Sequence, residues 1–140
     1  MRTQPVLAVT AISLLLATRP AVAHHAFSAE FDANRPLQLR GNVAKTEWIN
    51  PHSWIHIDVE DENGQVLTWA IECGAPNALM RRGLNKNSVP VGTELVIDGF
   101  QAKDGSNTAN ARDITLPDGS TFFVGSSGTG APYEKERPGQ

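Results

Sequence analysis

The sequence predicts an all-β domain with one short helix, arranged as an OB-fold-like small barrel of five strands. Apolar residues alternate with a period of two along most of the chain, as in half-buried strands. Residues 75–82 instead place helix formers after a proline, and a glycine follows them. The resulting order, three strands, a helix and two strands, is that of the OB-fold. An open β-sandwich or another small barrel is the alternative, because turn spacing does not reveal closure.

Each strand is predicted from its own alternation. The predicted strands are residues 37–48, 54–60, 66–72, 94–102 and 111–116, with residues 121–124 as a short extension. The first is long enough to need a bend, for which Gly41 is the candidate. The turn sequence DENG joins the second strand to the third and makes this pair the clearest hairpin. The sequence KDGSNTAN forms the loop between the last two strands.

Both ends of the chain differ in composition from this β-rich region. Residues 1–23 combine a positive start, an apolar stretch and an A-x-A site ending at Ala23, which predicts a cleaved signal peptide. The apolar stretch is too short to cross a bilayer, so we expect a periplasmic or secreted product with no membrane span after signal removal. An uncleaved N-terminal anchor is the alternative. Residues 24–36 are then an N-terminal arm, 37–125 the barrel domain and 126–140 a disordered tail.

Charge and cysteine content narrow the classes of partner. The chain has 12 Lys and Arg against 15 Asp and Glu, and its basic residues are scattered apart from Arg81 and Arg82. Nucleic-acid-binding proteins normally show a basic face, so we exclude that class.

Cys73 is the only cysteine, which rules out an intramolecular disulfide. We interpret it as a small buried hydrophobe, with a soft metal ligand or intermolecular pairing as alternatives.

The histidines occupy two short patches, and together they predict a metal site. The predicted cleavage makes His24 the first residue of the mature chain, with His25 behind it. An N-terminal histidine offers a metal both its α-amine and its imidazole. His52 and His56 are about 13 Å apart along a regular strand, too far to close on one ion. His52, at the strand entrance, is therefore the expected partner, and the predicted metal ligands are His24, His52 and His25.

Amine and imidazole nitrogens in a tetragonal plane favour copper, in the arrangement called a histidine brace. Zinc is the alternative, since three imidazoles would also satisfy it. Glu30 or Asp32 would supply a further ligand. A structural role is equally open, because a terminal HH pair can be solvated and a histidine after proline can hydrogen-bond a neighbour. Catalytic motifs are absent, which favours a non-enzymatic protein, with a copper-dependent redox enzyme as the narrower alternative.

A second hypothesis is a non-enzymatic module that binds a small organic ligand or a periplasmic protein partner, with structural histidines. Its weaker candidate residues flank the sheet face or lie in the loop between the last two strands, and they are Trp54, His56, Trp48, Asp104, Ser106 and Asn107. Tryptophans in strands are more often packing residues. For His56 the ordinary expectation is a surface position or a pairing with a carboxylate.

Four segments together resemble a known family. They are HHAF after the signal peptide, GNVAKTEWINPHSWIHIDV, GAPNALMRRG and GFQAKDGSNTANA. The combination is similar to a family of small exported bacterial proteins catalogued as a domain of unknown function, and the resemblance extends over residues 24–127. It implies a periplasmic or secreted β-rich protein and no particular activity. The family's characteristic marks map here onto His24, His25, Asn50, Pro51 and His52, whereas His56 is less characteristic.

Overall fold

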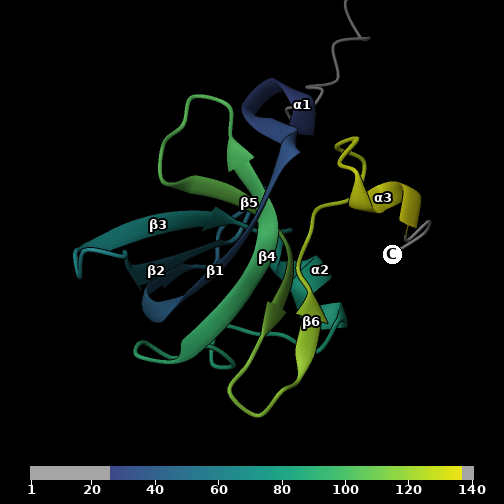
Figure 1. Ribbon diagram of the computed structural model, residues 1–140. Coiled ribbons are helices and arrows are strands. Elements are labelled where there is room, and N and C mark those ends of the chain that lie inside the picture. Colours follow the sequence, from purple (N-terminus) through teal and green to yellow (C-terminus); the bar gives the residue numbers. More distant parts are fainter. Residues whose placement is uncertain (1–25, 137–140) are drawn as a thin grey trace, which may run out of the picture.

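Six strands and three short helices make up the part of the chain that the structure covers. The structure is a computed structural model and describes residues 26–136. In chain order the elements are α1 (Phe27–Glu30), β1 (Phe31–Glu47), β2 (Trp54–Glu60), β3 (Val66–Glu72), α2 (Pro76–Arg81), β4 (Glu94–Ala102), β5 (Thr108–Thr115), β6 (Thr121–Phe123) and α3 (Tyr133–Glu136) (Figure 1). The predicted signal peptide, residues 1–23, lies outside the described residues, as do His24 and His25.

Five of these strands form a ring. The sheet has the order β3-β2-β1-β4-β5-β6, and each of these neighbours is antiparallel. A parallel pairing of β3 with β5 then joins Ile71 to Ala109 and Glu72 to Asn110, which closes the ring. Because this closing pairing is short, the ring is not quite a barrel. The predicted fold class, OB-like and mostly β with α2 between the third and fourth strands, is confirmed, and α1 and α3 are additional to the predicted helix.

Strand β1 is long because it serves two neighbours in turn. Its first part pairs with β4 and its last part with β2, and the change of partner occurs at Asn42. Gly41 allows this close approach, since a Cβ there would lie 2.5 Å from the backbone oxygen of Asp58. The strand starts at Phe31 rather than at the predicted residue 37, because Phe31 already pairs with Ala102 of β4. Part of the predicted N-terminal arm is therefore in the sheet.

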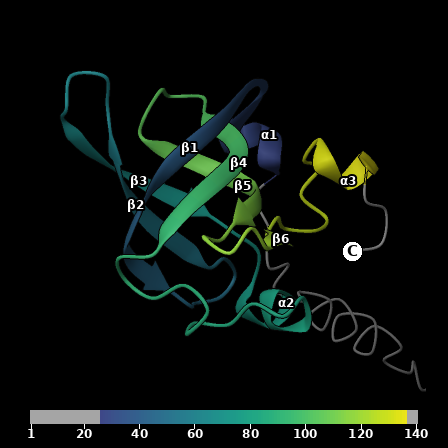
Figure 2. The same ribbon diagram turned by 60° about the horizontal axis from the view of Figure 1, so that its bottom comes forward.

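The main core fills the ring. Ile55, Ile57 and Ile71 are buried, as the alternation along the hairpin predicts. Leu79 of α2 joins the same cluster, and Figure 2 shows α2 at one end of the ring with α1 toward the other. Cys73 is fully buried there, and burial raises the pKa of its thiol. Its predicted role as a small buried hydrophobe is confirmed.

A second hydrophobic cluster joins the two ends of the described chain. Its buried members come from α1, β1, β4, β6 and the segment up to α3, and they are Phe27, Phe31, Ala102, Phe123, Ala131 and Tyr133. The rings of Phe123 and Tyr133 meet edge to face with their centroids 5.4 Å apart. The segment from residue 126 onward, for which disorder is predicted, is thus packed as far as Tyr133. The segment is mostly polar, but its one aromatic residue, Tyr133, is only 1 % exposed.

The helices of the described chain are all short. Between residues 26 and 136, none has the length and apolar character needed to cross a bilayer.

Candidate functional site

His52 lies in an irregular stretch just before β2. The backbone N–H of Ser53 donates to the oxygen of Gly74 at 3.0 Å, and the N–H of Cys73 donates to Ser53 at 2.8 Å. These bonds hold the strand entrance against the segment that leads into α2. His52 is consequently 4 % exposed. The regular alternation of inward and outward side chains starts only at Trp54, so it does not decide the burial of His52.

A cavity opens between His52, α2 and the segment that follows β6. Its volume is about 470 Å³. The polar residues that line it are His52, Asn77, Arg81, Arg82, Ser126 and Ser127. Pro51, Ala75 and Ala78 add an apolar portion. Among the described residues no Asp or Glu lines this cavity, which therefore has a cationic character.

A chain of buried polar groups extends from His52 into the sheet. His52 Nδ1 lies 3.2 Å from Ser126 Oγ, and the backbone of Ser126 in turn hydrogen-bonds the Tyr133 hydroxyl. That hydroxyl donates to Asn110 Oδ1 at 2.9 Å, and the Asn110 amide donates to Glu72 Oε1 at 3.0 Å. We call these five residues the polar chain. It links the cavity to the parallel pairing that closes the ring, where Glu72 faces Asn110.

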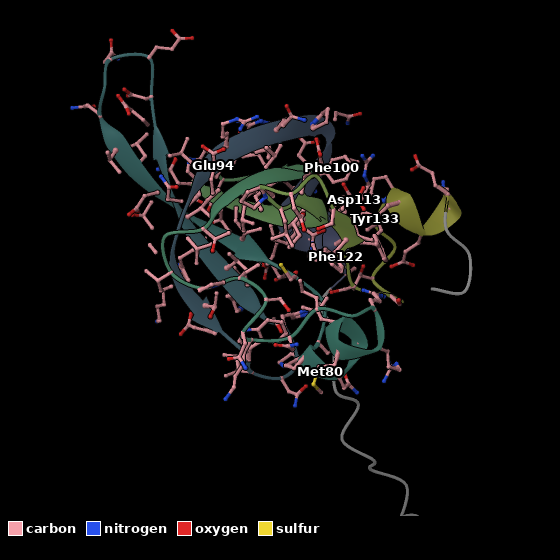
Figure 3. The ribbon with its side chains drawn as sticks, turned by 90° about the horizontal axis from the view of Figure 1, so that it is seen from below. Met80, Glu94, Phe100, Asp113, Phe122 and Tyr133 are labelled. Atoms are coloured by element: carbon pink, nitrogen blue, oxygen red, sulfur yellow. The ribbon has the colours of Figure 1, made fainter. Side chains whose placement is uncertain are left out.

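Tyr133 is the central member of the polar chain. It points from α3 toward the sheet (Figure 3). Burial raises its pKa to about 12, although hydrogen bonds from the backbone of Ser126 and from the side chain of Thr129 act in the opposite direction. The tyrosine is therefore neutral, and its hydroxyl keeps the proton that it donates to Asn110 at any physiological pH.

The sequence did not single out Glu72 or Tyr133. Glu72 stands in an ordinary strand position, and its contact with Asn110 depends on the pairing of β3 with β5, which leaves no local pattern. Tyr133 carried a usable signal, since it is the only tyrosine and the only aromatic residue in the tail predicted to be disordered.

His56 has a different environment from His52. It is half-buried on β2, and its Nε2 lies 2.9 Å from Glu47 Oε2 on β1. The same carboxylate accepts a bond from Lys45 Nζ at 2.8 Å. Lys45, and after it His56, lowers the pKa of Glu47. The expectation that His56 pairs with a carboxylate is confirmed, and the structure does not bring His56 to the cavity of His52.

The two candidate tryptophans are both partly buried, but they have different surroundings. Trp54 stands directly opposite Glu47 on one side and Glu72 on the other, and is partly exposed. Trp48 packs against the main core. Its indole N–H is buried without a hydrogen-bond partner in the described chain. Trp48 is thus a packing residue in this structure, and the two rings do not line the cavity beside His52.

The loop between β4 and β5 borders another cavity of about 470 Å³, next to α1. Asp104 and Ser106 line it, and the carbonyl of Asn107 accepts the N–H of Ala70. Asp104 Oδ1 accepts the backbone N–H of Ser106 at 2.9 Å, and this bond lowers the pKa of Asp104. The two cavities share no lining residue in the described chain, so this loop is not part of the site at His52.

The described side chains alone do not form a metal site. Within residues 26–136, no group of three or more His, Cys, Asp or Glu side chains is placed to hold one ion. His24 and His25, the other predicted ligands, lie outside the residues described.

Over residues 11–111 the chain matches the model of a family of unknown function called DUF6152. The matched region includes His52 and most of the ring, and it ends within β5. Neither a search of curated proteins nor a search of solved structures finds a match to the chain.

Proposed function

The chain belongs to the DUF6152 family of unknown function, and we propose that it is a small exported protein that binds a metal ion, most simply copper. The proposed ligands are His24, as the first residue of the mature chain, and His52, with His25 as a further donor. The HH and NPH sequences are then the functional marks of the chain. The observation that carries the proposal is the position of His52, which lines an open cavity with one ring nitrogen held in place.

The hydrogen bond at Nδ1 suits His52 to metal binding. Metal-binding histidines usually have their other ring nitrogen held by a hydrogen-bond partner, which sets the tautomer and the orientation of the ring. When Nδ1–H donates to Ser126 Oγ, the lone pair of the ring is at Nε2, the nitrogen that would coordinate the metal. The backbone of Ser126 hydrogen-bonds the Tyr133 hydroxyl, which in turn donates to Asn110. The polar chain thus supports a fixed imidazole.

The anchoring of Phe27 supports the contribution of His24. The backbone N–H of Phe27 donates to the oxygen of Thr129 at 2.8 Å, and Thr129 is three residues beyond Ser126, the partner of His52. Three residues of extended chain span about 10 Å, which is the length available between Phe27 and His24. The segment that holds His52 therefore also fixes the point from which the mature N-terminus extends.

The donor set favours copper over zinc. An α-amine and two imidazoles are neutral nitrogen ligands that fit a tetragonal plane, and Cu²⁺ leads the affinity series of divalent ions for such ligands. All three nitrogens must be deprotonated to bind, so affinity should fall as the pH drops below neutrality. Zinc is tested in the same titration as the competing ion.

The decisive experiment alters only the N-terminus. The mature protein is prepared with His24 as its first residue and, as the matched control, with one glycine placed before it. Each form is titrated with Cu(II) and examined by electron paramagnetic resonance. We expect the authentic form to bind about 100-fold tighter, equivalent to roughly 2.7 kcal/mol, and to give a spectrum different from that of the extended form.

Two results would contradict the proposal. Equal and weak binding by both forms would exclude the N-terminal chelate. The absence of binding by either form, with both folded by circular dichroism, would exclude metal binding as the function.

A further inference from the structure

The cavity beside His52 has a cationic wall that metal binding does not explain. Arg81 and Arg82, at the end of α2, both line it, and the described chain places no carboxylate in its lining. The chain as a whole is acidic, with a formal net charge of −3. Two guanidinium groups disfavour a cation and favour an anion. The lining therefore indicates an anionic occupant.

Arg82 is held in a fixed orientation. Its Nη1 donates to the backbone oxygen of Gly125 at 2.8 Å, and its Cζ lies 4.6 Å from the centroid of the Phe123 ring. A guanidinium that is stacked on an aromatic ring and bonded to the backbone loses little further freedom when a ligand binds. Arg82 is thus a preorganised part of the wall.

Arg81 differs from two of the arginines on the sheet. Arg40 pairs with Glu94, and Arg112 pairs with Asp113. Arg81 is exposed and has no carboxylate within 4.0 Å in the part of the chain that the structure describes. A surface arginine at a cavity rim can swing onto a ligand, and its planar fork matches a carboxylate or phosphate group.

The rest of the lining suits a small organic molecule. Asn77, Ser126 and Ser127 add amide and hydroxyl groups that can donate to oxygen atoms. Pro51 and Ala78 provide apolar contact, and a volume of about 470 Å³ is in the range of small-molecule sites. We propose that this cavity binds a small organic oxyanion, with its carboxylate or phosphate group on Arg81 and Arg82.

This inference goes beyond the metal proposal and does not depend on it. An anion on the arginines would lie on the same wall as a metal on His52. The anion would offset the positive charge that repels the metal, and the metal would attract the anion. The anion site itself is built from described residues, and it can be tested in the metal-free protein.

The test uses the metal-free mature protein and two-dimensional NMR titrations with succinate, inorganic phosphate and the uncharged analogue succinamide. We expect at least one of the two anions to shift the amide signals of Ser126, Ser127 and Asn77, and we expect succinamide to have no effect. Binding should weaken in high salt, because the arginines are near solvent. Succinate and phosphate in parallel distinguish a carboxylate ligand from a phosphate ligand.

Two variants complete the test. Arg81→Gln should weaken anion binding about tenfold, as expected for the loss of a charge-assisted hydrogen bond. The matched control Arg40→Gln removes an exposed arginine from the sheet and should leave anion binding unchanged. Equal weakening by the two variants, binding of succinamide as tight as that of succinate, or shifts confined to other regions would overturn the proposal. Copper titration of Arg81→Gln distinguishes this failure from failure of the metal site, since copper binding should persist in that variant.

Discussion

His52 and His56 are four residues apart in the sequence and occupy two different kinds of environment. His56 is part of a regular strand, and its partner Glu47 is nine residues away on the neighbouring strand. His52 precedes the strand, is 4 % exposed, and contacts Ser126, which is 74 residues away. Strand register alone places His56, whereas a contact with the C-terminal segment places His52.

The difference has a chemical consequence. The hydrogen bond of His56 with Glu47 is partly exposed, and Lys45 shares the carboxylate, so solvent screens the interaction. The imidazole of His52 is instead fixed by a buried chain of hydrogen bonds that ends at Glu72. Buried polar networks of this kind hold a side chain in one orientation, which a metal ligand requires.

The largest expected effect is on copper affinity. His52→Ala should weaken Cu(II) binding about 100-fold, since it removes a ligand, whereas His56→Ala should change the affinity by less than about threefold. Competition titration with a chelator of known affinity measures both values, and circular dichroism checks that both variants are folded. The reverse order would show that His56, and not His52, belongs to the site.

The next largest effect is on the free energy of unfolding and concerns Tyr133, which belongs to the polar chain of His52. Its pKa is about 12 in the folded protein, against an ordinary value of 10.0. Its contribution to stability is present below pH 10 and is lost as the pH rises to 12, because the unfolded chain ionises first. The difference between these two pKa values corresponds to roughly 2–3 kcal/mol of unfolding free energy.

Chemical denaturation between pH 9 and pH 12 measures this loss, with Tyr133→Phe as the comparison. The variant should lack this part of the pH dependence. In NMR spectra it should also shift the ring signals of His52 more than those of His56, because only His52 is linked to the polar chain. Equal shifts at both rings would contradict the proposed connection.

The smallest effect is expected at Glu47, on the His56 side. Glu47→Gln should lower thermal stability slightly, and the effect should disappear in high salt, as for an exposed ion pair. Since the pKa of Glu47 is lowered, its contribution is present above its ordinary pKa of 4.5 and is lost as the pH falls. Copper affinity should stay unchanged. Thermal melts at two salt concentrations measure this change in stability. Lys45→Gln, which removes the partner of Glu47 in the ion pair, is the control.

Several elements could be predicted from the sequence with correct bounds. The hairpin of β2 and β3 and the whole of β4 match their predicted ranges, and α2 differs from its prediction by one residue at each end. These segments carry their own signals, namely alternation, turn residues and a proline before helix formers. β5 begins at Thr108, three residues before its predicted start, because its first residues pair with β3.

The candidate site was only partly predictable. The position of His52 at the strand entrance follows from the point where the apolar alternation begins. Its separation from His56 follows from the spacing of residues along a strand. The partners of His52 did not follow, because the segment that carries Ser126 and Tyr133 has the composition of a disordered tail. Tyr133 and Ala131 place that segment in a hydrophobic cluster, and the average composition of the tail does not reveal these two residues.

The sequence by itself determined the order of strands and helix, the inward face of the hairpin and the class of fold, because backbone periodicity and turn chemistry act over a few neighbouring residues. Only the tertiary structure decided how the ring closes, which cavity His52 lines, and which groups hold it. Those outcomes depend on contacts such as Ser126 with His52 and Tyr133 with Asn110, between segments far apart in the chain. Such contacts form only when several elements pack at once, so no local pattern records them.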